Sequence, residues 1–122
     1  MCNTRDVASP LVPYMATITK IIDETPAIKT FQVVFDDPAV LENFGNKPGQ
    51  CCMLSVLGIG ESMISITSSP TRGGMLEFTI MKVGRLTTVI HELGVGDKLA
   101  IRGPYGNNFP FDAMKGKNCL FI

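Results

Sequence analysis

The sequence predicts an all-β fold, a six-stranded antiparallel Greek-key barrel capped by one short helix. Two observations support this. Six short runs are rich in β-branched and aromatic residues and are separated by turns of glycine, proline and aspartate. One stretch late in the chain instead repeats apolar residues at helical spacing. We expect the sheet to close into a barrel, because closure removes the exposed edges that six short strands would otherwise present.

Each strand is predicted from its own run of residues. In the second strand, Phe31, Val33 and Phe35 alternate and should face the core. The third is apolar nearly throughout and is expected to be buried on both faces. A single helical turn, 37–44, closed by Gly45, and a turn at 23–26 are also predicted. The six predicted strands are 14–22, 28–35, 50–57, 63–68, 75–83 and 98–102.

The helix predicted after the fifth strand has an apolar face that would plug one end of the barrel. Its apolar residues are Leu86, Val89, Ile90 and Leu93. Gly94 follows them, where a helix often ends on a residue of positive φ. His91, the only histidine, is placed away from the apolar stripe, in a structural role at the surface or its boundary.

The start of this helix is a candidate anion site. Gly84 has no side chain to cover the first turn, and the N–H groups of the next four residues lack partners inside the helix. Such N–H groups attract phosphate. Water is the usual occupant of a helix start, so this pattern alone leaves both occupants open. The side chains around the site are Lys82, Arg85, Thr87 and Thr88.

Composition limits the classes of function. The 122 residues include 11 basic and 11 acidic ones, which argues against nucleic acid or an anionic membrane as the main partner. The four cysteines lack metal-ligand spacing and are read as thiols in a reducing cytoplasm. No apolar run is long enough to span a bilayer. No pair of side chains suggests acid–base catalysis, so no catalytic residue and no metal site are predicted.

Three segments are predicted along the chain. Residues 1–13 form an extended lead-in, and residues 14–106 form the barrel. Residues 107–122 form a linker that ends in an apolar run, and we expect this run to be the opening strand of a further domain. A last strand added to the edge of the barrel is the alternative.

An ordered set of short motifs carries a family resemblance. They are Pro48-Gly49-Gln50, Ile64-Ser65-Ile66-Thr67-Ser68-Ser69-Pro70, Gly84-Arg85-Leu86-Thr87, Val95-Gly96-Asp97 and Gly103-Pro104-Tyr105-Gly106. Together they resemble the FAD-binding barrel of the ferredoxin–NADP⁺ reductase superfamily. The branch that they resemble most contains the gamma subunits of sulfhydrogenases and the electron-transfer subunits of dihydroorotate dehydrogenase.

The resemblance implies a set of FAD-binding residues. Two positions depart from the family pattern: Ser62 stands where the family has an arginine for the pyrophosphate, and Ile64 stands where it has a stacking tyrosine. Arg85 or Lys82 could compensate for the missing arginine. The implied residues are Ser62, Met63, Ile64, Ser65 and Ile66 on one strand, Ile80, Met81 and Lys82 on the next, and Gly84, Arg85, Leu86, Thr87 and Thr88 around the pyrophosphate.

The resemblance also implies a function. The chain would be the FAD-binding module of a cytoplasmic flavoprotein oxidoreductase that passes electrons between NAD(P)H and an iron–sulfur partner, in a hydrogenase or a similar multi-subunit complex. The resemblance implies that the further domain is an α/β nucleotide-binding domain whose first strand begins in the apolar run 118–122. NAD(P)H would bind to this domain, a 2Fe-2S cluster would bind to a later segment, and the present stretch alone would be inactive. The alternative is a non-enzymatic barrel that serves as an interaction or scaffold domain and has lost tight flavin binding.

Overall fold

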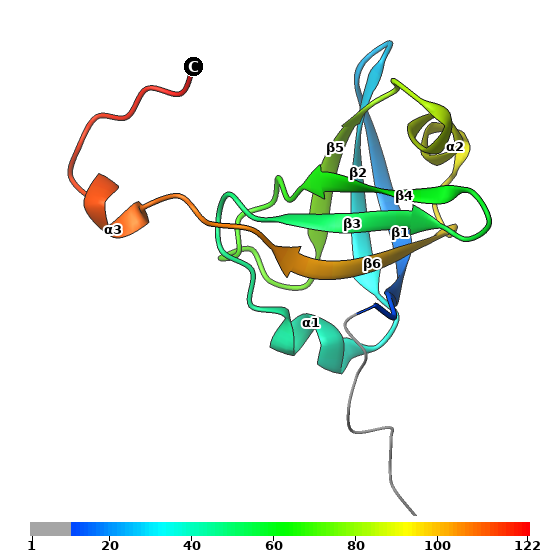
Figure 1. The fold of residues 1–122 in the computed structure, drawn as a ribbon, viewed down its shortest axis with the longest axis horizontal. Helices are drawn as coiled ribbons and strands as arrows, with labels where there is room; N and C mark the ends of the chain where they lie inside the picture. The colour runs from blue at the N-terminus through cyan, green and yellow to red at the C-terminus, as the bar shows by residue number, and fades with distance from the viewer. Residues whose placement is uncertain (1–10) are drawn as a thin grey trace, which may run out of the picture.

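The computed structural model describes residues 11–122. Six strands form the body of the molecule, and α1 and α2 lie near opposite ends of it (Figure 1). The elements in chain order are β1 (Tyr14–Thr25), β2 (Ile28–Phe35), α1 (Pro38–Phe44), β3 (Cys51–Val56), β4 (Gly60–Ser65), β5 (Leu76–Met81), α2 (Arg85–Glu92), β6 (Lys98–Tyr105) and α3 (Phe111–Met114).

All six strands belong to one sheet with the order β4-β3-β6-β1-β2-β5, and every neighbouring pair is antiparallel. Two hairpins, β1–β2 and β3–β4, are brought together because β6 returns to lie between β1 and β3. The predicted six-stranded antiparallel Greek-key fold with one short capping helix is therefore confirmed.

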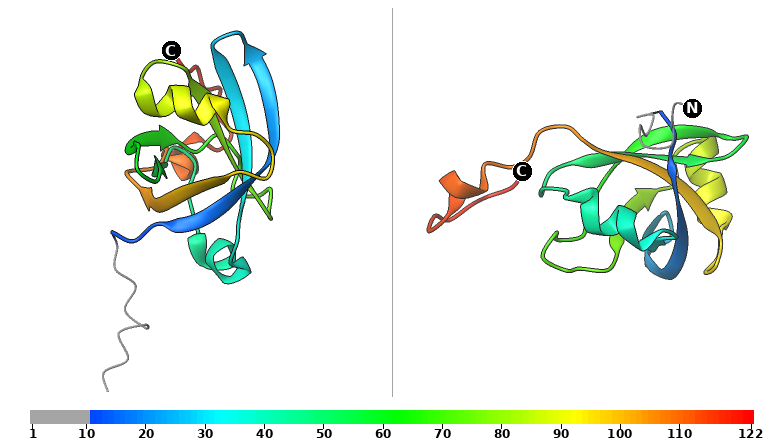
Figure 2. Two further views of the ribbon diagram at one scale, coloured as in Figure 1. Left: turned by 90° about the vertical axis from the view of Figure 1, so that its right-hand side faces the viewer. Right: turned by 90° about the horizontal axis from the view of Figure 1, so that it is seen from below.

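The sheet does not close, so the expected closed barrel is wrong. Strands β4 and β5 remain its two edges. They are joined just beyond the end of β4, where the Thr67 N–H donates to the Glu77 carbonyl over 2.9 Å and the Glu77 N–H donates to Ser68 Oγ over 3.0 Å. From this seam the two strands run in different directions, and α2 lies toward the open end between them (Figures 1 and 2). We call this opening the β4–β5 wedge.

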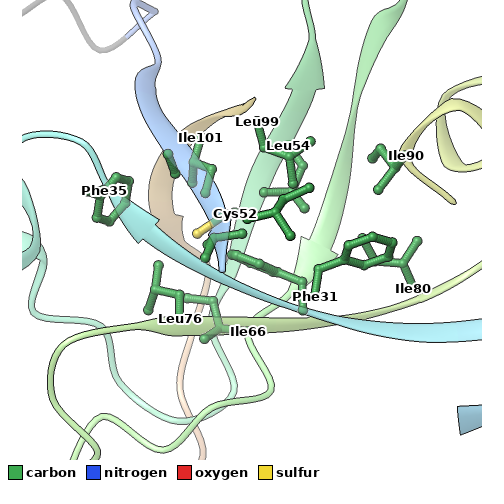
Figure 3. Packing of buried hydrophobic residues seen from close by; sticks show 14 of the residues in the cluster. Phe31, Phe35, Cys52, Leu54, Ile66, Leu76, Ile80, Ile90, Leu99 and Ile101 are labelled. Carbon is green, nitrogen blue, oxygen red and sulfur yellow. The ribbon is translucent and has the colours of Figure 1, made fainter. Parts of the chain in front are cut away.

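The core lies between the curved faces of the sheet (Figure 3). Phe31 and Val33 face inward with Phe35, as their alternation predicts, and Phe78 joins them from β5. Ile90 of α2 is fully buried in the same cluster, which confirms that the helix plugs the core. Burial of each such side chain stabilises the fold by about 1.5–3 kcal/mol. Packing in this cluster therefore stabilises the curved sheet.

Several boundaries differ from those predicted. Strand β1 runs on to Thr25, because Ile22 and Asp23 still pair with β2, so the turn is limited to residues 26–27. Strand β4 begins at Gly60 and ends before residue 66, and β6 continues to residue 105. Only alternate residues of β3 are fully buried, since its outer face is partly exposed.

The ends of α1 agree with the sequence prediction better than the end of α2 does. Asp37 caps α1, where its Oδ1 accepts from the N–H of Ala39 over 3.0 Å, and Gly45 ends the helix at φ 58°. Gly45 closes the helix as the sequence predicts, and Asp37, the first residue of the predicted turn 37–44, is its N-cap. Gly94 does not have positive φ; α2 ends at Leu93 in an extended conformation, and Gly96, at φ 95°, makes the turn into β6.

Residues 107–122 lead away from the barrel (Figure 1). Residues 118–122 join no strand of the sheet, so the alternative of a last edge strand is wrong. A further nucleotide-binding domain stays a prediction. Of the predicted lead-in 1–13, residues 1–10 lie outside the described part. Within residues 11–122, no helix has the length and hydrophobicity needed to cross a membrane.

The close approach of β6 to β3 at Gly103 gives a test of this fold. A Cβ at Gly103 would lie 3.3 Å from the Cys51 carbonyl oxygen and 3.4 Å from the Cys52 Cα, whereas one at Gly96 would meet nothing within 4 Å. Both glycines have positive φ. We expect Gly96→Ala to lower the free energy of unfolding by about 1–2 kcal/mol and Gly103→Ala by roughly 1–3 kcal/mol more, as measured by urea denaturation. Equal losses would contradict the tight β3–β6 contact.

Candidate cofactor site

The open edge of β4 presents main-chain polar groups to the wedge. The Ile66 N–H donates to the Gln50 carbonyl on the β3 side over 3.0 Å, and the Thr67 N–H points the other way, toward β5. Because successive residues of a strand point their N–H groups to opposite sides, the main chains of Ser65 and Met63 face the wedge. Their side chains are exposed as well.

The edge of β5 is arranged in the same way. The Lys82 N–H donates to the Ala27 carbonyl on the β2 side over 2.8 Å, whereas Glu77 bonds across the seam. By the same alternation, the main chains of Thr79 and Met81 face the wedge. Two unpaired strand edges therefore flank one opening, and their N–H and C=O groups need partners.

The N-terminus of α2 follows β5 directly. Among the described residues, the N–H groups of Arg85, Leu86 and Thr87 make no hydrogen bond, while the Thr88 N–H donates to the Gly84 carbonyl over 2.9 Å. Three free N–H groups thus remain where the sequence predicts four. A Cβ at Gly84 would meet nothing within 4 Å, so space is open above the first turn.

The Thr87 hydroxyl holds this first turn together. Thr87 Oγ1 accepts from the N–H groups of Val83 and Gly84, each over 2.9 Å, and donates to the Gly84 carbonyl over 3.2 Å. A hydroxyl has one donor and two acceptor positions, so all are used, and the residue is only 7% exposed. Thr87 therefore orients backbone groups. Thr88 is half-buried, and its hydroxyl makes no hydrogen bond within residues 11–122.

Two basic residues lie next to the free N–H groups in the chain. Lys82 and Arg85 are exposed, and neither belongs to an ion pair in the described part of the chain. The start of a helix adds a partial positive charge of about half an elementary charge. The site is suited to an anion that bears oxygen acceptors.

His91 fixes the other end of α2, and its predicted surface position is wrong. The side chain is 7% exposed, and its Nε2 lies 2.8 Å from the Ile80 carbonyl oxygen of β5. Because a carbonyl only accepts, Nε2 carries the proton. Lys29 Nζ donates to the His91 carbonyl over 3.3 Å. The role of His91 is structural, as predicted, but it lies inside, because the last turn of α2 packs against β5.

Only some of the side chains predicted for the site are exposed to solvent. Met63, Ser65, Met81, Lys82 and Arg85 are exposed. Ser62, Ile64, Leu86 and Thr88 are half-buried, and Ile64 and Leu86 pack against the core. Ile66 and Ile80 are buried at 9% and 1% exposure and point into the core, so only their main chains are near the edges.

A clamp that the sequence did not predict holds the edge strand β4 in place. Arg102 of β6 donates from Nε to Glu61 of β4 over 3.0 Å and from Nη1 to the Tyr105 hydroxyl over 3.2 Å. The hydrogen bond from Arg102 lowers the pKa of Glu61, and the same bond raises the pKa of Arg102. The pair spans β3, so it fixes the strand that lines the wedge.

Cys52 is a buried thiol of the core. Burial raises the pKa of the Cys52 thiol to about 12, so it stays protonated and is not a nucleophile. No group of three metal-ligating side chains occurs in residues 11–122. What the wedge does offer is unpaired backbone donors and acceptors and exposed positive charge.

Comparison with known proteins identifies the family. Residues 16–109 match the model described as the oxidoreductase FAD-binding domain. The chain belongs to this family. The sulfhydrogenase 1 gamma subunit of Pyrococcus furiosus is 43% identical over 114 residues, which are 93% of this chain and 39% of that protein. A probable dihydroorotate dehydrogenase B electron transfer subunit of Methanocella arvoryzae is 39% identical over 97 residues, or 80% of this chain and 33% of that one.

Solved structures confirm the fold of this FAD-binding domain. A ferredoxin-NADP⁺ reductase from Plasmodium falciparum has a TM-score of 0.68 at 20% identity, covering 87% of this chain and 46% of that one. The ferredoxin reductase in carbazole 1,9a-dioxygenase has a TM-score of 0.67 at 24% identity, covering 81% of this chain and 31% of that one. The chain spans about two fifths of the length of the sulfhydrogenase subunit.

The wedge fits the chemical demands of FAD. The open space at Gly84 and the three free N–H groups suit a diphosphate, with Lys82 and Arg85 beside them. The two strand edges offer donors and acceptors for a polar chain and a ring, and exposed Met63 and Met81 offer apolar contact. Ser62, where the family resemblance implies an arginine, supplies no charge.

The hydrogen bonds of Thr87 lead to a stability prediction. Thr87→Val keeps the side-chain shape but leaves the N–H groups of Val83 and Gly84 without their acceptor. We expect it to lower the free energy of unfolding by about 1–2 kcal/mol, the usual range for a lost helix cap, as measured by urea denaturation. Thr87→Ser should retain most of the stability. Thr88→Val is the matched control and should have little effect; an equal loss in both valine variants would contradict the assigned role.

Proposed function

We propose that this domain holds FAD in the β4–β5 wedge, as the flavin module of an oxidoreductase that passes electrons between NAD(P)H and an iron–sulfur partner. The observation that carries the proposal is the start of α2. There, the described residues include three unpartnered N–H groups, an open space at Gly84 and two exposed cations beside it in the chain, and the chain belongs to the FAD-binding domain family.

The residues would divide the binding between them. The N–H groups of Arg85, Leu86 and Thr87 would donate to the pyrophosphate, with the Thr88 hydroxyl at the same turn. Arg85 and Lys82 would supply the positive charge that Ser62 lacks. Thr87 would act indirectly, because its hydroxyl already bonds to the backbone.

The strand edges would hold the rest of the cofactor. The main chains of Met63 and Ser65 on one side and Met81 on the other would bond to the ribityl chain and the polar edge of the ring. Half-buried Ile64 would contact the flavin by dispersion, in the position of an aromatic residue. Bound FAD supplies the redox chemistry, since a flavin accepts a hydride and releases single electrons. The protein orients it and limits its contact with water.

The remaining parts of the activity belong to a longer assembly. We propose that NAD(P)H binds to a further domain, that a 2Fe-2S cluster binds to another segment, and that this stretch alone does not oxidise NAD(P)H. The names of the similar proteins, a sulfhydrogenase gamma subunit and an electron transfer subunit, support iron–sulfur or hydrogenase subunits as partners. A cytoplasmic location is consistent with the free thiols of Cys51, Cys52 and Cys119.

Gly84 gives the sharpest test of this proposal. Its φ of −159° is extended and suits any residue, and a side chain there would enter only open space. Gly84→Val should therefore fold, but it should weaken FAD binding at least about tenfold, because the added methyl groups occupy the pyrophosphate position. Titration of flavin fluorescence measures the affinity.

Gly73→Val is the matched control, because Gly73 also lacks positive φ and faces open space in another loop. It should leave the FAD affinity unchanged. If Gly84→Val bound FAD as tightly as the unmodified protein, the pyrophosphate would not lie at α2. A protein that takes up no FAD at all would favour the scaffold alternative.

A second prediction concerns the charge that replaces the family arginine. Arg85→Gln should weaken FAD binding about tenfold, the lower end expected for a charge-assisted hydrogen bond at an exposed site. It should also reduce the loss of affinity caused by added salt. Lys117→Gln removes a cation from the segment that leads away from the barrel and serves as the control. Unchanged affinity and salt dependence in Arg85→Gln would show that Arg85 does not contact the pyrophosphate.

A further inference from the structure

Apolar side chains are exposed on the outer face of the sheet near the tip of the β1–β2 hairpin. Ile28 and Met81 stand directly opposite each other in the β2–β5 pair. Because Phe78 and Ile80 of β5 are buried in the core, Met81 and its partner Ile28 lie on the outer face. Met81 is 52% exposed, and Ile28 is half-buried. We call these two residues, together with Val83, the tip patch.

Val83 extends the tip patch to the start of α2. It is 73% exposed, follows Met81 by two residues and comes directly before Gly84, where the space above the first turn is open. The Lys82 N–H donates to the Ala27 carbonyl over 2.8 Å, so the end of β5 is still joined to the hairpin (Figure 1). The tip patch therefore adjoins the proposed pyrophosphate site.

A carboxylate borders the tip patch on the β1 side. Glu24 Oε1 accepts from the Thr30 hydroxyl over 2.9 Å, and Thr30 lies two residues after Ile28, on the same face of β2. Glu24 is exposed and belongs to no ion pair within residues 11–122, and its Oε2 makes no hydrogen bond there. The carboxylate can therefore accept a further hydrogen bond beside Ile28.

Three chemical features thus follow one another on this surface: the anion site of α2, the apolar tip patch and the acceptor on Glu24. The adenosine half of FAD presents matching groups in the same order, because its phosphates lead to a flat base that ends in an amino group. Apolar side chains pack against the faces of nucleobases, and carboxylates accept from their amino groups. The flavin ring instead has donors and acceptors along one edge, which the two unpaired strand edges of the wedge can match.

From these observations we propose that the tip patch binds the adenine base of FAD. The adenosine half leaves the pyrophosphate site over Val83, the base packs against Ile28 and Met81, and its amino group donates to Glu24 Oε2. The inference rests on the proposed FAD function and extends it to the half of the cofactor that the wedge does not hold. It also makes the β1–β2 hairpin the element that selects FAD over FMN.

Three probe molecules with the same diphosphate group test this assignment. Inorganic pyrophosphate, ADP and inosine diphosphate are each titrated into the protein, and NMR follows the methyl groups of Ile28, Met81 and Val83. ADP should bind at least about tenfold more tightly than pyrophosphate, because its base adds apolar contact. Inosine diphosphate, which has an oxygen in place of the amino group, should bind about threefold to tenfold more weakly than ADP, because it loses the hydrogen bond to Glu24.

Two variants separate the apolar contact from the hydrogen bond. Val83→Ser should lower the ADP-to-pyrophosphate affinity ratio at least about threefold. Glu24→Gln keeps an acceptor for the Thr30 hydroxyl and should bring the ADP-to-inosine-diphosphate ratio to about one. Both variants should weaken FAD binding and leave FMN binding unchanged. Val95→Ser is the matched control, because Val95 is also exposed and lies in the turn beyond the other end of α2; it should change neither ratio.

Three results would overturn the inference. One is an ADP affinity no higher than that of pyrophosphate, another is an unchanged pair of ratios in Val83→Ser and Glu24→Gln, and the third is a shift of the Ile28 and Val83 methyl signals by FMN, which would place the flavin there. In each case FAD would still bind, and Gly84→Val would still weaken its binding, if the proposed function holds. Failure of the proposed function differs, because the protein would then take up no FAD or Gly84→Val would have no effect.

Discussion

The incomplete seam between β4 and β5 is the constraint on which the rest of this structure depends. The sheet is bent nearly into a barrel, yet in the described residues the β4 and β5 edges bond to each other over a short seam, where Thr67 and Ser68 meet Glu77 and Thr79. Beyond that point each strand has an unpaired edge, and unpaired edges in a protein must be covered or given other partners. Here α2 covers the core at the wide end, and the edges remain free to hold a ligand.

The placement of α2 determines what the wedge can bind. Thr87 ties the first turn of the helix to the end of the preceding segment, and His91 ties its last turn to the Ile80 carbonyl of β5. Fixed at both ends, the helix keeps its free N–H groups directed at one place before any ligand arrives. Such preorganisation reduces the entropy lost on binding, which matters in a site whose charged side chains are exposed.

The local features of this chain could be predicted from its sequence because they depend on nearby residues. The alternation of Phe31, Val33 and Phe35 identified the inward face of β2, and Asp37 and Gly45 marked both ends of α1. The glycine turn at Gly84 marked the start of α2 for the same reason. Each of these features depends on residues close together in the chain and not on the strands that pair with them.

The features that were missed depend on distant partners. The clamp between Glu61 and Arg102 joins residues 41 apart in the chain, through a strand between them. His91 was predicted at the surface because its hydrogen-bond partner is the main-chain carbonyl of Ile80 on β5. Every residue has such a carbonyl, so the sequence does not show which one a side chain will meet. The opening between β4 and β5 was not predicted for a related reason. The composition of a strand shows which of its faces is buried, but not how far it diverges from another strand. The three hydrogen bonds of the Thr87 hydroxyl to the backbone were also missed, because they become visible only in the folded turn.

The position of positive charge in the wedge follows from these same constraints. The family resemblance implies a cation on β4, at Ser62, where the side chain would be half-buried. This chain instead carries its cations before and at the first turn of α2, on exposed Lys82 and Arg85. Exposed charges are screened by water and salt and contribute less than partly buried ones. In the proposed binding mode, the backbone N–H groups, which the helix holds in place, would then provide the larger share of pyrophosphate binding, so the geometry of α2 would matter more than the identity of any one side chain.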